Sequence, residues 1–173
     1  FLEFSRPPTL VFRPTAVRSL VDDLLMLYRH QLIKNNVAVE VDVPLDLPQV
    51  HVDPDQIKQV FLNLLANAVD AIQGMGRNPP GGAIMITADT TVSPEGHGEL
   101  VFLFRDDGPG IPAESRAHIF DAFYTTKTTG TGLGLAISSR IMKNHGGSLA
   151  LESDATAGTT FVVRIPINDG DET

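Results

Sequence analysis

The chain has 173 residues, of which 42% are hydrophobic and 15 are glycine, a composition that fits one globular domain and excludes a disordered or fibrous protein. Its 13 Lys and Arg residues stand against 21 Asp and Glu residues, and the formal net charge of −8 argues against a nucleic-acid partner. The absence of cysteine excludes disulfides and thiolate chemistry and fits a cytoplasmic location.

The first half of the chain predicts, in order, a linker, a helix, two strands and a second helix, over residues 1–14, 15–35, 37–43, 50–52 and 54–74. The linker contains three prolines and shows no periodicity. The first helix and the first strand follow from apolar residues spaced by three or four and by two, respectively. Asp53 followed by Pro54 is typical of a helix N-cap, so we expect the second helix to begin there.

The second half predicts a hairpin, a polar segment, a helix, two more strands and a tail. Their ranges are 83–90 and 99–106 for the hairpin, then 111–129, 133–144, 148–153, 160–167 and 168–173. Helices and strands do not alternate as they do in a parallel βαβ protein. We therefore expect an α+β fold, a two-layer sandwich in which helices cover one face of a single mixed sheet.

Two asparagines share one face of the helix expected over 54–74. Asn63 and Asn67 are four residues apart, so both amides lie on the same side of a helix that is otherwise largely apolar. An amide oxygen is a neutral ligand suited to Mg²⁺, which keeps several waters and also binds phosphate oxygens. On spacing alone, however, an ordinary polar helix face explains the pair better.

An acidic, glycine-containing turn directly follows the strand expected over 99–106. It reads Asp106-Asp107-Gly108-Pro109-Gly110. A carboxylate at a strand end can accept a hydrogen bond from the exocyclic amine of adenine, and the glycines let a flat ligand approach the main chain. The same residue types also make a plain turn, so this motif alone decides little.

Glycines recur where the helix over 133–144 is expected to begin, in the sequence Gly130-Thr131-Gly132-Leu133-Gly134-Leu135. Backbone N–H groups at a helix N-terminus are suited to phosphate oxygens. No strand directly precedes these glycines, which argues against a dinucleotide-binding fingerprint, and the chain has no GxxxxGK[ST] pattern for a P-loop. A last turn, Gly158-Thr159-Thr160-Phe161, leads into the final strand.

The order and spacing of these motifs resemble the ATP-binding catalytic domain of bacterial sensor histidine kinases. QVFLNLLANAVDA is similar to the N box, DDGPG to the first glycine box, IFDAFYTTK to the F box, and GTGLGL and GTTF to the later glycine boxes. This family belongs with gyrase, the ninety-kilodalton heat-shock chaperone and mismatch-repair ATPases. The resemblance covers residues 15–167 and implies the Bergerat-type ATP-binding form of the α+β sandwich.

The resemblance implies a binding or catalytic role for each matching residue. Asn67 would be the principal Mg²⁺ ligand, assisted by Asn63. Asp106 would hold the adenine amine, helped by Thr159 through water. The further nucleotide-binding positions would be Gly108, Gly110, Gly130, Gly132, Leu133 and Gly134.

The resemblance also implies that residues 111–129 form a lid over ATP. Phe120 and Phe123 would anchor this lid. Lys127 would reach the phosphates and act with Asn67 in catalysis, and Arg116 could assist.

Two positions differ from patterns common among these relatives. Many histidine kinases carry Lys or Arg three residues after the magnesium-binding asparagine, whereas this chain has Asp70, so one phosphate contact would be absent or replaced. Hydrolysing relatives carry a glutamate general base where this chain has Asn63, and an amide cannot accept a proton at neutral pH. The resemblance therefore favours transfer of the γ-phosphoryl group over hydrolysis.

None of the five histidines of the chain has the sequence context of a phosphoryl acceptor. We therefore expect the acceptor on a dimerisation domain outside this sequence, and the receiver domain of a response regulator as the next partner. Residues 1–14 would include the end of a dimerisation helix, 15–167 the catalytic domain and 168–173 a tail. We expect this piece to be a monomer.

The chain opens at Phe1 rather than Met, so we expect a piece of a longer protein, whose parent could be membrane-anchored. A nucleotide-binding interaction module without phosphotransfer is the alternative function. A serine kinase of the anti-sigma type shares the expected fold but fits the F box less well.

Overall fold

The computed structural model describes residues 9–127, 130–152 and 157–168. Its elements in chain order are β1 (Arg13–Thr15), α2 (Val17–Lys34), β2 (Val37–Asp42), β3 (Val50–Val52), α3 (Pro54–Gly74), β4 (Gly82–Val92), β5 (Gly98–Asp106), α4 (Ala113–Arg116), α5 (Gly134–Asn144), β6 (Ser148–Leu151) and β7 (Thr159–Pro166). No helix among these residues is both long enough and apolar enough to cross a bilayer.

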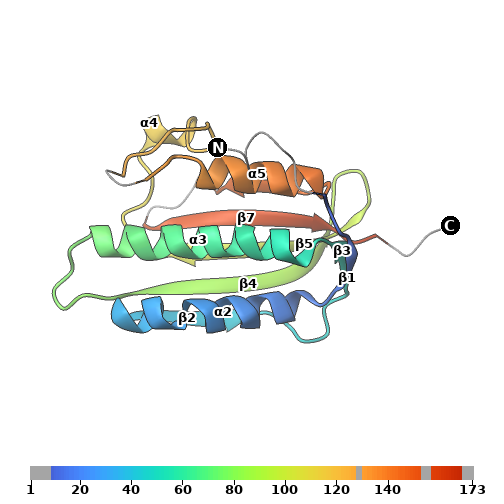
Figure 1. Ribbon diagram of the computed structural model, residues 1–173, viewed down its shortest axis with the longest axis horizontal. Helices are drawn as coiled ribbons and strands as arrows, with labels where there is room; N and C mark the ends of the chain where they lie inside the picture. Colours follow the sequence, from blue (N-terminus) through green and yellow to red (C-terminus); the bar gives the residue numbers. More distant parts are fainter. Residues whose placement is uncertain (1–8, 128–129, 153–156, 169–173) are drawn as a thin grey trace.

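Five strands form one mixed sheet in the order β2-β4-β5-β7-β6. β2 pairs with β4 in parallel, and the other neighbours pair antiparallel. Helices α2, α3 and α5 lie side by side over one face of this sheet, and β1 pairs with β3 at one end of the molecule (Figure 1). The predicted α+β sandwich, with a mixed sheet covered by helices on one face, is confirmed.

The core lies between α3 and the central strands. Strand residues alternate between the two faces of the sheet, so every second residue of β5 from Leu100 to Asp106 is buried. The ring of Phe61 on α3 packs against those of Phe102 and Phe104, each with a centroid distance of 5.0 Å. Because aromatic side chains bury large areas, these contacts fix how far α3 lies from β5 and how it is rotated.

The start of α3 agrees with the prediction. Asp53 is the N-cap, and its Oδ1 accepts hydrogen bonds from the backbone N–H groups of Asp55 and Gln56 at 3.1 and 3.3 Å. Its Oδ2 accepts a third, 3.0 Å long, from the N–H of Val11. The same carboxylate therefore caps α3 and joins its start to the chain just before β1.

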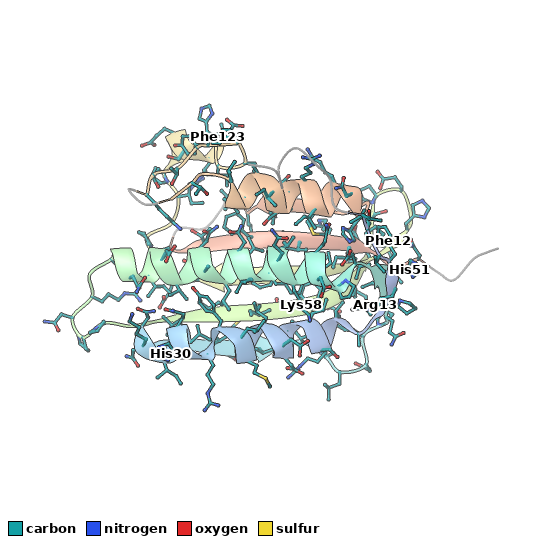
Figure 2. All side chains as sticks on the ribbon, viewed as in Figure 1. Phe12, Arg13, His30, His51, Lys58 and Phe123 are labelled. Carbon is teal, nitrogen blue, oxygen red and sulfur yellow. The ribbon has the colours of Figure 1, made fainter. Side chains whose placement is uncertain are left out.

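The segment before α2 is more ordered than the linker that the sequence predicts. Arg13 and Pro14, which we expected in a linker, belong to β1 and pair with β3. The ring of Phe12 stacks on His51 and meets the edge of His145, with centroids 6.0 and 5.0 Å apart, at the end of the molecule labelled in Figure 2.

The short helix α4 falls in the expected lid and was not predicted. Four residues are too few to show a helical period. Residues 1–8 of the expected linker, 128–129 of the expected lid and 169–173 of the expected tail lie outside the described residues.

Replacing Asp53 by Ala should lower the free energy of unfolding at pH 7 by about 1–2 kcal/mol, because the helix loses its cap and Val11 loses its acceptor. Burial raises the pKa of Asp53, but the N–H donors of Val11, Gln56 and Asp55, with His145 nearby, outweigh burial and hold that pKa below its usual value. The stabilisation is thus complete above the ordinary aspartate pKa and is lost as the pH falls through the lowered one.

Urea unfolding of the wild type and Asp53→Ala at neutral and acid pH measures this difference. Asp46→Ala is the control, since Asp46 is exposed in a turn. A stability difference that stayed constant into strong acid would contradict the role of the ionised carboxylate.

Candidate active site

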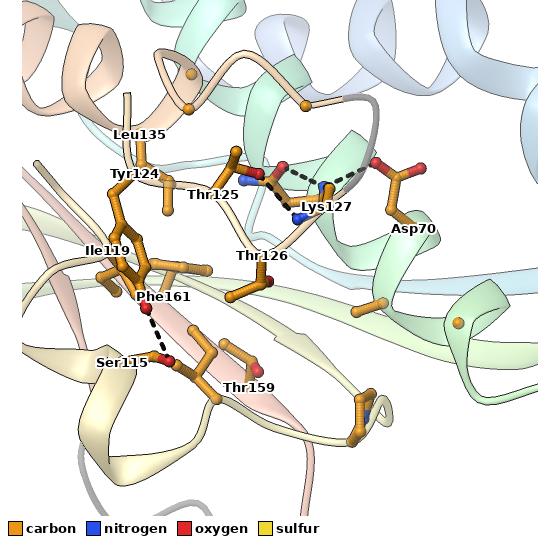
Figure 3. A pocket seen from close by; sticks show the side chains of 18 of the residues that line it. Asp70, Ser115, Ile119, Tyr124, Thr125, Thr126, Lys127, Leu135, Thr159 and Phe161 are labelled. Atoms are coloured by element: carbon orange, nitrogen blue, oxygen red, sulfur yellow. Dashed lines mark hydrogen bonds and ion pairs between the residues drawn. The ribbon is translucent and has the colours of Figure 1, made fainter. Parts of the chain in front are cut away.

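A cavity of about 530 Å³ lies between α3, the turn after β5, the start of β7, the expected lid and the glycines before α5. Figure 3 shows its lining from close by. The predicted site residues among its lining are Asn63, Asn67, Asp106, Gly110, Lys127, Gly130, Gly132, Gly134 and Thr159. Gly108 and Leu133 are not among the lining residues, although each directly adjoins one or two that are.

The two asparagines face the cavity because the apolar side of α3 is buried against the sheet. Nδ2 of Asn63 donates a 3.1 Å hydrogen bond to Oγ of Ser138, which is buried on α5. This bond fixes the orientation of the amide by its nitrogen and leaves its oxygen available to bind a cation. A Cβ on Gly134 would overlap Oδ1 of Asn63, so a larger residue there would displace the amide from its present position.

Asp106 ends β5 at the edge of the cavity and is only 5% exposed. Its Oδ1 accepts a 2.8 Å hydrogen bond from the N–H of Gly108, and its carboxylate also accepts one from the backbone of Thr159. Burial raises the pKa of Asp106 above its ordinary value, with a smaller contribution from the charge of Asp107, although the two N–H donors partly oppose this rise. A buried carboxylate that faces a cavity is a specific acceptor for an N–H group of a ligand.

Arg77 holds the turn after β5 in place. Its Nη1 donates to the carbonyl of Gly81 at 2.9 Å and to Oδ1 of Asp107 at 3.1 Å. The same Asp107 oxygen accepts the N–H of Ala83 at 3.0 Å. Sequence analysis missed this clamp because Arg77 and Asp107 are far apart along the chain.

Side chains of the expected lid contact the sheet and one another. Phe120, as predicted, packs against Phe161 of β7 with the rings edge to face and centroids 6.4 Å apart. Tyr124 donates from its hydroxyl to Oγ of Ser115 at 3.0 Å. Arg116 donates to the carbonyl of Ile111 at 3.1 Å and does not line the cavity, so its predicted assistance to the phosphates is not supported.

Phe123 does not anchor the lid through burial, contrary to the prediction. It is 68% exposed and projects outward from the molecule (Figure 2). Its backbone is left-handed, with φ of 68°, and its N–H donates to the carbonyl of Gly132 at 2.8 Å. Gly132 itself has φ of 71°, and a Cβ there would overlap the backbone of Phe123, so this contact requires glycine.

Lys127 reaches across the cavity from the lid to α3 (Figure 3). Its Nζ lies 2.8 Å from Oδ2 of Asp70 and 3.2 Å from Oδ1 of Asn67. The backbone N–H of Lys127 donates to Oγ1 of Thr125 at 3.0 Å, which shapes the turn that carries it. The Asp70 contact was not predicted, because nothing in the sequence relates residues 57 positions apart.

The cavity lining suits a magnesium ion that arrives with phosphates. Among the described residues, no three His, Cys, Asp or Glu side chains gather as a metal cage. Mg²⁺ usually binds through one or two protein oxygens together with waters and substrate phosphates. An ammonium already lies at Oδ1 of Asn67, which shows that this oxygen is accessible to a cation.

Comparison with known proteins agrees with this geometry. The family model described as Histidine kinase-, DNA gyrase B-, and HSP90-like ATPase matches residues 52–169. Sporulation kinase E of Bacillus subtilis (strain 168) is 30% identical over 99% of this chain and 22% of that protein. The sensory histidine kinase/phosphatase NtrB of Rhizobium leguminosarum bv. phaseoli is 38% identical over 88% of this chain and 41% of that protein. The chain thus spans less than half the length of these two relatives.

Solved structures match the fold at similar levels of identity. The catalytic domain of histidine kinase ThkA aligns with a TM-score of 0.74 at 31% identity, covering 90% of this chain and 95% of that domain. Full-length ShkA in complex with AMPPNP gives 0.75 at 27% identity, over 93% and 32% of the two chains. ThkA in complex with the response regulator protein TrrA gives 0.76 at 28% identity, over 99% and 46%. The chain therefore belongs to the histidine kinase-, DNA gyrase B- and HSP90-like ATPase family, as an ATP-binding catalytic domain of a sensor histidine kinase.

Proposed function

We propose that this domain binds Mg-ATP in the cavity and transfers its γ-phosphoryl group to a histidine on a dimerisation domain outside this sequence. The observation that carries the proposal is that one cavity holds a buried carboxylate, Asp106, two amides on one helix face, Asn63 and Asn67, and a lid lysine, Lys127. The AMPPNP complex of ShkA supports a nucleotide in the corresponding fold.

Asp106 would bind the adenine end of the nucleotide. Its carboxylate would accept the hydrogen bond of the exocyclic amine, and because the side chain is buried, little water competes for that bond. Thr159, 6% exposed beside it, would complete this end through a bridging water.

Asn67 would bind the phosphate end together with Asn63. Magnesium bound there supplies charge neutralisation for the phosphoryl oxygens. Lys127 would donate to the same oxygens from the lid, as would backbone N–H groups at the start of α5, where Gly134 lines the cavity. These residues orient the γ-phosphorus and exclude water while the lid is closed.

Transfer, rather than hydrolysis, is the reaction that these groups favour. An imidazole nitrogen of the acceptor histidine attacks the γ-phosphorus while the bond from this phosphorus to the β,γ-bridging oxygen breaks, leaving ADP. Asn63 cannot serve as a base toward water. No histidine is among the cavity-lining residues that the structure describes, which supports an acceptor from another segment.

The phosphohistidine would then pass its phosphoryl group to the receiver domain of a response regulator in two-component signal transduction. The complex of ThkA with the response regulator protein TrrA supports this class of partner. The alternative is an interaction module that binds ATP without transfer. Adding a histidine-containing dimerisation domain and radiolabelled ATP separates them, since only the kinase yields acid-labile phosphate on that domain.

Asp106→Asn should weaken ATP binding roughly ten- to a hundredfold, because a charged hydrogen bond to the adenine amine is lost. The variant should also lose its preference for ATP over GTP, since an amide can donate to the guanine carbonyl. Calorimetric titration with a non-hydrolysable analogue of each nucleotide measures both. Asp107→Asn is a poor substitute, because Asp107 supports the turn; Asp89→Asn, on the exposed part of β4, is the matched control. Unchanged ATP affinity in Asp106→Asn would contradict the adenine assignment.

Asn67→Ala should abolish the dependence of nucleotide affinity on Mg²⁺ while leaving the binding of metal-free nucleotide almost unchanged. The reason is that its oxygen would contact the metal rather than the phosphates. Titrations with Mg²⁺ and with a chelator, beside wild type and Asn144→Ala at the exposed end of α5, measure this. If Mg²⁺ strengthened binding equally in Asn67→Ala and wild type, the metal would lie elsewhere.

A further inference from the structure

The contact between Lys127 and helix α3 places a cation where the proposed metal would bind. Nζ of Lys127 is shared between Oδ2 of Asp70 at 2.8 Å and Oδ1 of Asn67 at 3.2 Å (Figure 3). Both charged side chains are partly exposed, 42% for Lys127 and 49% for Asp70, so either can exchange partners without unfolding anything.

Lys127 and Mg²⁺ cannot occupy this position together. Two cations on one amide oxygen would lie within a few ångströms of each other, where like charges repel strongly away from bulk water. Loading the site as proposed therefore requires Lys127 to leave Asn67. Because Lys127 belongs to the lid, this movement couples metal loading to the position of the lid.

The charges around the cavity show why Asp70 matters. Among the described lining residues, Lys127 is the single side-chain cation, and Asp70 and Asp106 are the anions. Without its partner, Asp70 would repel an incoming triphosphate from the same helix face that carries Asn67. Paired with Lys127, Asp70 is neutralised before the nucleotide arrives.

We propose that Asp70 is a lid-positioning residue. In the nucleotide-free domain its carboxylate holds Lys127, and therefore the lid, against α3. When Mg-ATP binds, its phosphates replace the Asp70 carboxylate as the partner of Lys127. This inference rests on the proposed function. The proposal gives a role to Asp70, which stands where many relatives carry Lys or Arg. In this chain Lys127 of the lid would supply the cation that those relatives carry on the helix. An exposed ion pair is weak enough for a triphosphate to outcompete.

Hydrogen exchange of the lid in the nucleotide-free protein tests the first half of the proposal. Asp70→Asn should speed exchange in peptides within residues 111–127 by roughly two- to fivefold, the range expected for losing one exposed ion pair. With saturating Mg-AMPPNP, wild type and variant should exchange alike. Asp23→Asn is the matched control, because it removes the same charge and one surface ion pair, to Lys58 at 3.2 Å, away from the cavity. Equal lid exchange in wild type and Asp70→Asn without nucleotide would overturn the proposal.

Exchanging the charges of residues 70 and 127 distinguishes the effect of their contact from the effect of a change in net charge. Asp70→Lys alone should speed lid exchange, whereas Asp70→Lys combined with Lys127→Asp restores an opposite pair and should slow it again. A double variant whose lid exchanges as fast as that of Asp70→Lys would show that the ion pair does not hold the lid.

Affinity for Mg-AMPPNP tests the second half. Asp70→Asn should bind at least as tightly as wild type, while Lys127→Met should bind more weakly. Weaker binding by Asp70→Asn would overturn the displacement, because a group that must be displaced cannot strengthen binding. No binding by the wild type would refute the proposed function and the displacement, but the exchange difference between nucleotide-free proteins would still decide whether Asp70 holds the lid.

Discussion

The packing of α3 against β5 is the constraint on which the rest of the site depends. The ring of Phe61 is held by Phe102 and Phe104, and the buried stripe of the helix faces the sheet along its whole length. A helix fixed in this way has no freedom to rotate, so residues at spacings of three and four outside the stripe emerge along one line. Asn63, Asn67 and Asp70 form that line along the cavity, and in the proposed function their order sets where the metal, the phosphates and the lid would meet.

The second constraint is the end of β5, where the domain keeps a carboxylate out of water. Burial alone would favour the neutral form of Asp106, and the N–H groups of Gly108 and Thr159 compensate for part of that cost. Both donors are themselves held in place: Gly108 lies next to Asp107 in the Arg77 clamp, and Thr159 begins β7, which pairs with β5. The adenine end of the proposed site is therefore built on paired strands, whereas the phosphate end faces the expected lid.

Local patterns in the sequence predicted the elements that are long or capped. The period of α3, its cap at Asp53 and the alternation of the hairpin strands each reside in neighbouring residues, so the fold class and most element positions followed from them. β1 was missed because the prolines of residues 1–14 indicate a linker, and α4 because four residues are too few to show a helical period. The wrong role for Phe123 came from its motif, whereas its left-handed backbone depends on a contact with Gly132 that no local pattern specifies.

The site was predictable where a motif names a residue and unpredictable where two distant residues meet. The Ser138 bond that orients Asn63, the Arg77 clamp and the Asp70–Lys127 pair all join segments that only the fold brings together. The last of these changes how the departure at Asp70 is understood. From the sequence alone, an acidic residue there would remove a phosphate contact. In the fold, Asp70 pairs with Lys127, the lysine that we propose supplies such a contact.

The balance of charge then links the metal to the lid. A triphosphate in this cavity would face two lining carboxylates and one lysine, so neutralisation must come from Mg²⁺, from Lys127 and from the N–H groups at the start of α5. A relative with a basic residue on α3 keeps part of that compensation on a rigid helix, whether or not metal is bound. Here the cation is on the lid and starts at the oxygen that the metal needs. If Mg²⁺ binds at Asn67 as proposed, metal loading and the release of Lys127 from Asn67 occur together, and the position of the lid would depend on magnesium as well as on the nucleotide.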